Sequence, residues 1–216
     1  KPIVVPGDPS SAAFLIVAAL ITEGSDLILE RVGLNPFRTG LLSTLKEMGA
    51  DLRISNAGED TGEPIGDIQV RYSELCGVDV PAARAPSMID EYPILAMAAA
   101  CAKGITRMEG LGELRVKESD RFEAIVSGLS ACGVRTEANG DSIIVEGCAG
   151  LVPGGAMIPV QLDHRIAMAF LVLGAAAQSP IGVDDASVIS TSYPAFLDHI
   201  TNLGANLSGY TQMEEG

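Results

Sequence analysis

The basic residues that could hold an anion stand at or near the starts of expected helices. Lys117 and Arg121 are four residues apart in residues 114–121, and Arg165 directly precedes the apolar residues 166–177. If 114–121 is helical, Lys117 and Arg121 share one face, where like charges are unfavourable unless a phosphate or carboxylate lies between them. A cation at the N-terminal end of a helix is also unfavourable without an anion, because that end carries a partial positive charge. These placements indicate a site for anions.

The same residues also have purely structural interpretations. Asp8 or Ser10, Asp90 and Asp163 precede apolar helices and could simply cap them through hydrogen bonds to free backbone N–H groups. Acidic residues between the cations could neutralise them on a solvated face. His164 could orient its neighbours or make only a structural hydrogen bond. Both interpretations stay open on spacing alone.

The elements that must position these residues recur along the chain. We expect units at residues 1–76, 77–150 and 151–216, the last one strand short. Each unit combines a strand, an apolar helix, a second strand, an amphipathic helix that ends at glycine, and two further strands. The apolar helices are predicted at residues 12–22, 94–102 and 166–177. Amphipathic helices are predicted at residues 39–48 and 121–131.

The apolar helices have almost no polar face, so they must be buried. The strands alternate apolar and charged residues, which is typical of a sheet with one face in water. The sequence therefore predicts an α/β (α+β) fold of β-α-β-α-β-β units around a pseudo-threefold axis. Helices lie at its centre and sheets lie outside. We expect one domain over residues 1–216.

Composition excludes several classes of protein. The chain has 216 residues, with 14 Lys+Arg against 28 Asp+Glu and a net charge of −14, so nonspecific nucleic-acid binding is not expected. No apolar run is long enough to span a bilayer, and we expect a cytoplasmic protein with buried, reduced cysteines. The four cysteines form no CxxC, so no metal site is expected. His199 is expected to be exposed or capping, and Asp184-Asp185 to form a turn at a strand end.

Four motifs, in this order, resemble one family. They begin at Gly7 (Gly-Asp-Pro-Ser-Ser), Pro86 (Pro-Ser-Met-Ile-Asp-Glu-Tyr-Pro-Ile-Leu-Ala), Leu114 (Leu-Arg-Val-Lys-Glu-Ser-Asp-Arg) and Leu162 (Leu-Asp-His-Arg-Ile-Ala-Met). The motifs resemble the C-terminal domain of 5-enolpyruvylshikimate-3-phosphate (EPSP) synthases, and they cover essentially the whole chain. The family has two domains, each with three such units. The resemblance implies that the start of the full family chain returns to complete the third unit here.

The resemblance also implies an activity. The family transfers the enolpyruvyl group of phosphoenolpyruvate to the 5-hydroxyl of shikimate 3-phosphate, in the shikimate pathway, without a metal or organic cofactor. By resemblance, Asp90 accepts the hydroxyl proton and contacts shikimate 3-phosphate, as does Lys117. Glu118 moves protons at the methylene carbon, and Arg121 and Arg165 hold phosphoenolpyruvate. The basic residues of the family's N-terminal half supply the other wall of the cleft, so that half is the expected partner.

Two other functions remain open. The repeat could be a non-catalytic scaffold that binds another chain, or the chain could be an enolpyruvyl transferase for a nucleotide sugar, which should lack the motif at residues 114–121. One departure from the family pattern lies at residues 190–194, Ser-Thr-Ser-Tyr-Pro, where many members have a lysine before the Ser/Thr-aromatic-Pro segment.

Overall fold

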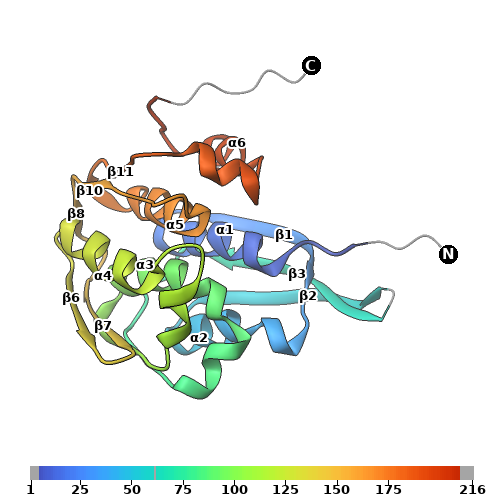
Figure 1. Ribbon diagram of the computed structural model, residues 1–216. Helices are drawn as coiled ribbons and strands as arrows, with labels where there is room; N and C mark the ends of the chain where they lie inside the picture. The colour runs from blue at the N-terminus through green and yellow to red at the C-terminus, as the bar shows by residue number, and fades with distance from the viewer. Residues whose placement is uncertain (1–4, 61, 210–216) are drawn as a thin grey trace.

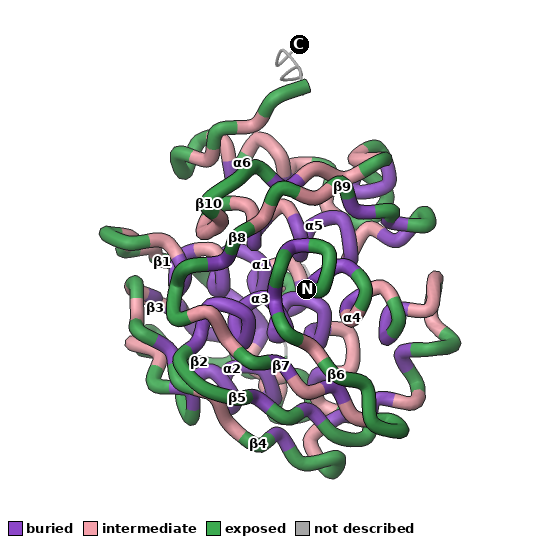
Figure 2. The backbone as a smooth tube through the Cα atoms, turned by 90° about the vertical axis from the view of Figure 1, so that its left-hand side faces the viewer, coloured by how far each residue is buried: buried purple, intermediate pink, exposed green. Residues whose placement is uncertain are grey.

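Apolar helices α1 (Pro9–Ile21), α3 (Tyr92–Cys101) and α5 (His164–Gly174) form the centre of the molecule (Figures 1 and 2). The computed structural model describes residues 5–60 and 62–209. All ten residues of α3 are buried. This confirms the burial predicted from the missing polar face. α5 ends at Gly174, three residues before the predicted end, because the chain turns there into a strand that begins at Ala177.

Three further helices lie outside the central ones. These are α2 (Gly40–Glu47), α4 (Arg121–Ala131) and α6 (Phe196–Asn202). Each is followed by a glycine with positive φ: Gly49 at 95°, Gly133 at 80° and Gly204 at 102°. Glycine enters this left-handed conformation without steric cost, so it ends the helix and turns the chain into the next segment.

The sheet of the first unit is antiparallel, with strand order β1–β3–β2. Its strands are β1 (Asp26–Gly33), β2 (Asp51–Asp60) and β3 (Glu63–Arg71). Along β3, Ile68 and Val70 are fully buried, whereas the residues beside them are partly exposed. One face of the sheet therefore packs on the central helices and the other faces water, as the alternating sequence predicted.

The sheet of the second unit has the order β4–β5–β7–β6. β4 (Asp79–Val80) pairs with β5 (Lys103–Met108) in parallel, and β7 (Ser142–Cys148) pairs antiparallel with both β5 and β6 (Arg135–Asn139). β5 thus has a parallel partner, β4, on one side and an antiparallel partner, β7, on the other.

The strands of the third unit are short and pair only in parallel within the described residues. β8 (Val152–Gly154) pairs with β10 (Ala177–Ser179), and β9 (Met157–Ile158) pairs with β11 (Gly182–Val183). β9 supplies the opening strand of this unit. In residues 152–209 no antiparallel strand takes the position that β7 has in the second unit.

Short 3₁₀ helices connect these elements, and Arg38 and Asp90 lie on two of them. They are η1 (Pro36–Arg38), η2 (Ala82–Ser87), η3 (Ile89–Glu91), η4 (Gly112–Val116) and η5 (Ser187–Thr191). None of the helices in the described ranges has the length and hydrophobicity that crossing a bilayer requires.

The expectation that the cysteines are buried is only partly correct. Cys101 and Cys132 are buried, Cys148 is half-buried and Cys76 is exposed. Cys76 is exposed because it lies in the connection between β3 and β4 rather than in a core element.

Candidate active site

The N-terminal ends of the central helices are arranged in two different ways. Asp8 caps α1 by accepting hydrogen bonds from the backbone N–H groups of Ser10 and Ser11. Asp163 caps α5 in the same way. Asp90 lies inside η3, before α3, and caps no helix end in the described part of the chain. The capping interpretation therefore holds for Asp8 and Asp163 but is wrong for Asp90, whose carboxylate is free for other contacts.

Cations from separate segments surround the Asp90 carboxylate. Arg121 Nη1 lies 3.1 Å from Asp90 Oδ1, and Lys117 Nζ lies 3.7 Å from the same oxygen. Arg165 Nη2 lies 3.7 Å from Oδ2, and its Nη1 donates a hydrogen bond to the Asp90 backbone carbonyl at 3.3 Å. The structure thus brings together residues that are up to 75 positions apart in sequence.

Arg121 is the innermost member of this group. Its side chain has no exposed surface, and its Nε donates to Oδ2 of the equally buried Asp163 at 2.7 Å. Ser119 donates to the same oxygen at 2.9 Å. Burial raises the pKa of Asp163, but the hydrogen bond and charge of Arg121 outweigh it and hold that pKa below its usual value. Asp163 therefore both caps α5 and fixes the Arg121 guanidinium.

Glu118 covers the remaining end of Arg121. Its Oε2 lies 2.5 Å from Arg121 Nη2, and its side chain is 51% exposed. This contact is an ion pair without hydrogen-bond geometry, so Nη2 is a buried donor with no hydrogen-bond partner among the described residues. Such a donor is costly to leave unsatisfied. An anion that displaced Glu118 would satisfy it.

Lys117 and Arg121 do not share a helix face, which corrects the sequence-based expectation. η4 ends at Val116, Lys117 has an extended backbone, and α4 begins only at Arg121. The two cations converge because both reach Asp90, not because of helical spacing. Glu113 Oε1 lies 2.6 Å from Lys117 Nζ, and this contact is the main cause of the raised pKa of Lys117.

His164 is half-buried at the start of α5. Burial, and then the neighbouring Arg165, lower the pKa of its ring, which favours the neutral form. No hydrogen bond joins this ring to Asp163 or Arg165 in the structure as described. The orientation of Asp163 comes instead from Arg121, Ser119 and the backbone of α5.

Other residues weighed in the sequence lie away from this group. His199 is exposed on α6, and its Nδ1 is 2.8 Å from Tyr193 Oη. Asp184 accepts a hydrogen bond from Val160 N, and Asp185 accepts from the backbone and hydroxyl of Ser187. The pair directly follows the strand end at Val183, as predicted, but only the Asp185 carboxylate holds the local turn, whereas that of Asp184 ties the chain to Val160.

Sequence reasoning missed part of the group. Glu91 is 5% exposed and accepts a hydrogen bond from the Ser10 hydroxyl, and Glu113 pairs with Lys117. The sequence signal for Glu91 was its position directly after Asp90. Its burial could not be predicted, because glutamate is seldom buried without a partner. Nothing in the sequence connects Arg38, on η1, with this end of the molecule, although it donates to Ser10.

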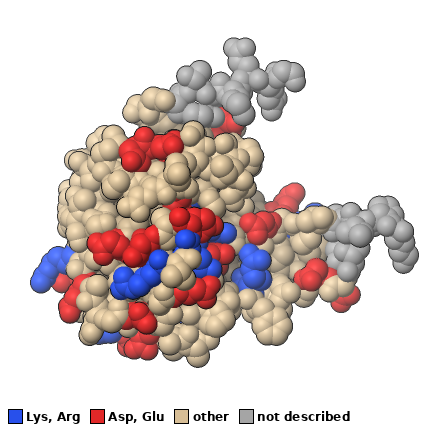
Figure 3. Space-filling model, viewed as in Figure 1, with Lys and Arg blue, Asp and Glu red and all other residues tan. Residues whose placement is uncertain are grey.

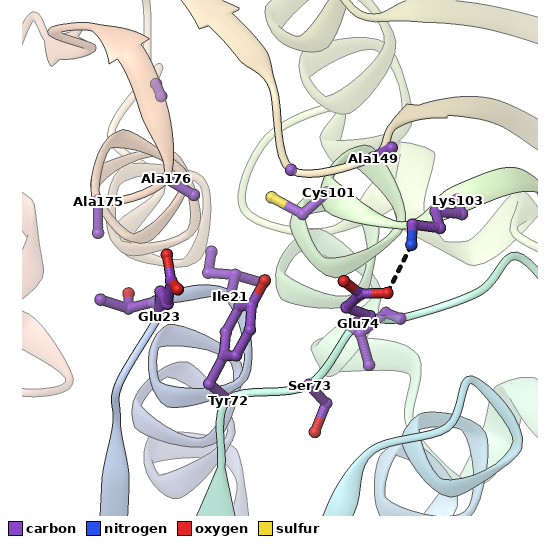
Figure 4. A pocket seen from close by; sticks show the side chains of 14 residues that line it. Ile21, Glu23, Tyr72, Ser73, Glu74, Cys101, Lys103, Ala149, Ala175 and Ala176 are labelled. Atoms are coloured by element: carbon purple, nitrogen blue, oxygen red, sulfur yellow. Dashed lines mark hydrogen bonds and ion pairs between the residues drawn. The ribbon is translucent and has the colours of Figure 1, made fainter.

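A pocket lies elsewhere, at the C-terminal ends of the central helices (Figure 4). It has a volume of about 290 Å³, and Ile21, Cys101 and Ala175 mark the helix ends around it. Glu74 and Lys103 form an ion pair at its wall. None of the predicted site residues lines it. In the group around Asp90, the side chains of Asp90 and Glu118 are partly exposed, whereas Arg121 is fully buried. Lys and Arg side chains gather among acidic ones on the face shown in Figure 3.

The fold is shared with a known class of proteins. The structure matches the enolpyruvyl transferase NikO from Streptomyces tendae with a TM-score of 0.71 at 20% identity, over 94% of this chain and 44% of that one, which shows a shared fold. The chain belongs to the EPSP synthase family: the model of that family, EPSP synthase (3-phosphoshikimate 1-carboxyvinyltransferase), matches residues 1–200.

Individual relatives agree with this assignment. A 3-phosphoshikimate 1-carboxyvinyltransferase of Paramagnetospirillum magneticum is 58% identical over 97% of this chain and 47% of its own length. One from Cereibacter sphaeroides is 59% identical over 95% of this chain and 46% of its own length. The structure of EPSP synthase from Acinetobacter baumannii superimposes with a TM-score of 0.91 at 44% identity, over 94% of this chain and 47% of that one. The chain spans about half the length of these relatives.

Proposed function

We propose that this chain forms one wall of the active site of an EPSP synthase. The complete enzyme, meaning this chain together with the half of its relatives' length that it does not span, transfers the enolpyruvyl group of phosphoenolpyruvate to the 5-hydroxyl of shikimate 3-phosphate. The second wall comes from that other half.

The observation that carries this proposal is the set of cations around one uncapped carboxylate. Lys117, Arg121 and Arg165 come from separate segments and all reach Asp90. They lie at the positive ends of the central helices, where an anion is stabilised further. Both proposed substrates are anions, and the site offers a carboxylate base among fixed cations.

Asp90 is the group that we assign to the hydroxyl proton. As the 5-hydroxyl oxygen bonds to C2 of phosphoenolpyruvate, Asp90 accepts the hydroxyl proton and Glu118 donates a proton to the methylene carbon. This produces a tetrahedral intermediate. The C2–O bond to the phosphate then breaks and phosphate leaves with the proton that Asp90 holds, while a proton returns from the methyl group to Glu118 as the new enol ether forms. A positioned carboxylate is suited to each of these transfers.

Arg121 and Arg165 hold phosphoenolpyruvate in this proposal, and Lys117 binds shikimate 3-phosphate. Arginine can grip a carboxylate or phosphate with two parallel hydrogen bonds. Because Arg121 is fully buried beneath Glu118, substrate binding requires Glu118 to move off Arg121 Nη2. That movement would also bring the Glu118 carboxyl toward the substrate whose methylene carbon it protonates.

Phosphate release tests the proposal. The purified chain alone should not turn over phosphoenolpyruvate and shikimate 3-phosphate, because positioning both substrates needs both walls. The same chain with the missing half, in one polypeptide or as two mixed parts, should release phosphate and form the enol ether. A complete protein that binds its second half but never releases phosphate would instead support a non-catalytic scaffold.

A further inference from the structure

Glu91 is a buried carboxylate with no role in the transfer described above. It is 5% exposed, and it lies on η3 directly after Asp90. Its Oε1 accepts a hydrogen bond of 2.5 Å from the Ser10 hydroxyl and lies 3.9 Å from Arg165 Nη1. Burial is the main cause that raises the pKa of Glu91. A carboxylate so deeply buried is unfavourable unless specific partners hold it.

A chain of contacts ties Glu91 to all three units of the fold. Arg38 Nη2 donates to the Ser10 oxygen at 2.7 Å, and the Ser10 hydroxyl donates to Glu91. Arg38 and Ser10 belong to the first unit, Glu91 to the second and Arg165 to the third. Since Ser10 accepts from a cation while it donates to a carboxylate, the two hydrogen bonds strengthen each other. Glu91 is thereby held in one place.

Among the described residues, Arg165 has few ion-pair or hydrogen-bond partners besides Glu91. Its side chain is 14% exposed, and its other contacts are the backbone carbonyl and carboxylate of Asp90. Without the charge of Glu91, the guanidinium would be attracted to the Asp90 carboxylate alone. It would then neutralise the proton acceptor and turn away from an incoming anion.

We propose that Glu91, held by Ser10, is a positioning residue that keeps the Arg165 guanidinium directed at phosphoenolpyruvate instead of closing onto Asp90. This inference rests on the function proposed above, because it assigns Arg165 to phosphoenolpyruvate. It adds Glu91 and Ser10 as residues that act through Arg165 without touching substrate.

A double-mutant cycle in the complete enzyme tests it. Glu91→Gln keeps the shape and an acceptor for Ser10 but removes the charge. It should raise the KM for phosphoenolpyruvate about three- to tenfold, with the KM for shikimate 3-phosphate and kcat much less affected. In an Arg165→Lys background the same change should add less than about twofold, because the group through which Glu91 acts is already altered. Glu123→Gln, which removes an exposed carboxylate in the first turn of α4, is the matched control.

Two results would overturn the inference. One is a KM for phosphoenolpyruvate in Glu91→Gln equal to that of the Glu123→Gln control. The other is full additivity with Arg165→Lys. If Glu91→Gln does not fold, Ser10→Ala replaces it, since it removes only the hydroxyl that holds Glu91 and should change the same KM in the same direction.

A second measurement separates this inference from the proposed function. In ¹⁵N NMR spectra, rotation of the Arg165 guanidinium about its Nε–Cζ bond should be slow in the wild type and faster in Glu91→Gln, but unchanged in the control. Changed rotation in an enzyme that releases no phosphate would contradict the proposed function and leave the positioning role standing. Normal turnover with unchanged rotation and KM would contradict the positioning role alone.

Discussion

The two ends of the central helices are built from different chemistry. At the N-terminal ends, side-chain carboxylates cap α1 and α5, and the buried pair of Arg121 and Asp163 extends to the partly exposed Asp90. At the C-terminal ends, backbone N–H groups from neighbouring connections do the capping: Ser73 donates to Leu20 of α1 and Gly150 to Cys101 of α3. No basic residue stands in the last turn of α1, α3 or α5.

The pocket and the charged residues of the candidate site lie at opposite ends of the central helices. The pocket of about 290 Å³ lies at the C-terminal ends, where the ion pair of Glu74 and Lys103 is largely exposed. The charged residues to which we assign proton transfer and anion binding lie at the N-terminal ends, where none of them lines that pocket.

The largest effect should come from Asp90, at the N-terminal ends. In the complete enzyme, Asp90→Asn should lower kcat about 10²–10⁴-fold and leave the KM for phosphoenolpyruvate within a few-fold, because the amide keeps the shape but cannot accept a proton. Steady-state kinetics on both substrates measure this. Circular dichroism should show an unchanged fold, since Asp90 caps no helix. Turnover near the wild-type rate would reject Asp90 as the base.

Arg121 should be the residue of this group that matters most for stability. Arg121→Met removes the cation from a pair in which both side chains have no exposed surface, and it leaves the Asp163 charge buried. Losing one partner of a buried pair typically costs about 3–5 kcal/mol of unfolding free energy. Urea denaturation of the chain measures it. Arg107→Met breaks an exposed pair with Asp79 and serves as the control, which should unfold close to the wild type.

A smaller effect concerns acid stability and again depends on Asp163. Because its folded-state pKa lies below the value of 3.8 expected for a free Asp side chain, the unfolded chain binds the proton more tightly. The stabilisation that Asp163 contributes is therefore present at pH values above its unfolded-state pKa. It is lost as the pH falls through the folded-state pKa of Asp163. Asp163→Asn should make the unfolding free energy depend less on pH between about pH 5 and 2. An unchanged slope would mean that Arg121 does not lower this pKa.

Much of the fold could be predicted because its strongest signals are local. A helix without a polar face has to be buried, which identified α1, α3 and α5, and the glycines after α2, α4 and α6 marked their ends. The end of α5 could not be predicted, because Ala176 and Ala177 suit an apolar helix equally well, and only the pairing of β10 with β8 removes them from it.

The candidate site was predictable in its members but not in its contacts. Charges at helix starts pointed to Arg121 and Arg165. Helical spacing gave the wrong reason for the approach of Lys117 and Arg121, since η4 ends at Val116, Lys117 is extended and α4 begins only at Arg121. The contacts from Ser10 to Glu91 and onward to Arg165 join residues 81 and 74 positions apart. Only the packing of the central helices brings them together, and no local pattern encodes it.

The smallest effect is expected at the C-terminal ends of the central helices. It tests directly whether these ends act independently of the N-terminal ends. Glu74→Gln removes the charge from the pair with Lys103, whose side chains are 67% and 54% exposed. Solvent screens such a pair strongly, so the unfolding midpoint should stay within experimental error. The kcat and both KM values of the complete enzyme should also be unchanged, because Glu74 lies at the far ends of helices whose other ends carry the charged group. Lys103→Met removes the other partner and should behave alike. If either variant lowered kcat while the protein stayed folded, the two ends would be coupled, and the pocket would have to be included in the functional site.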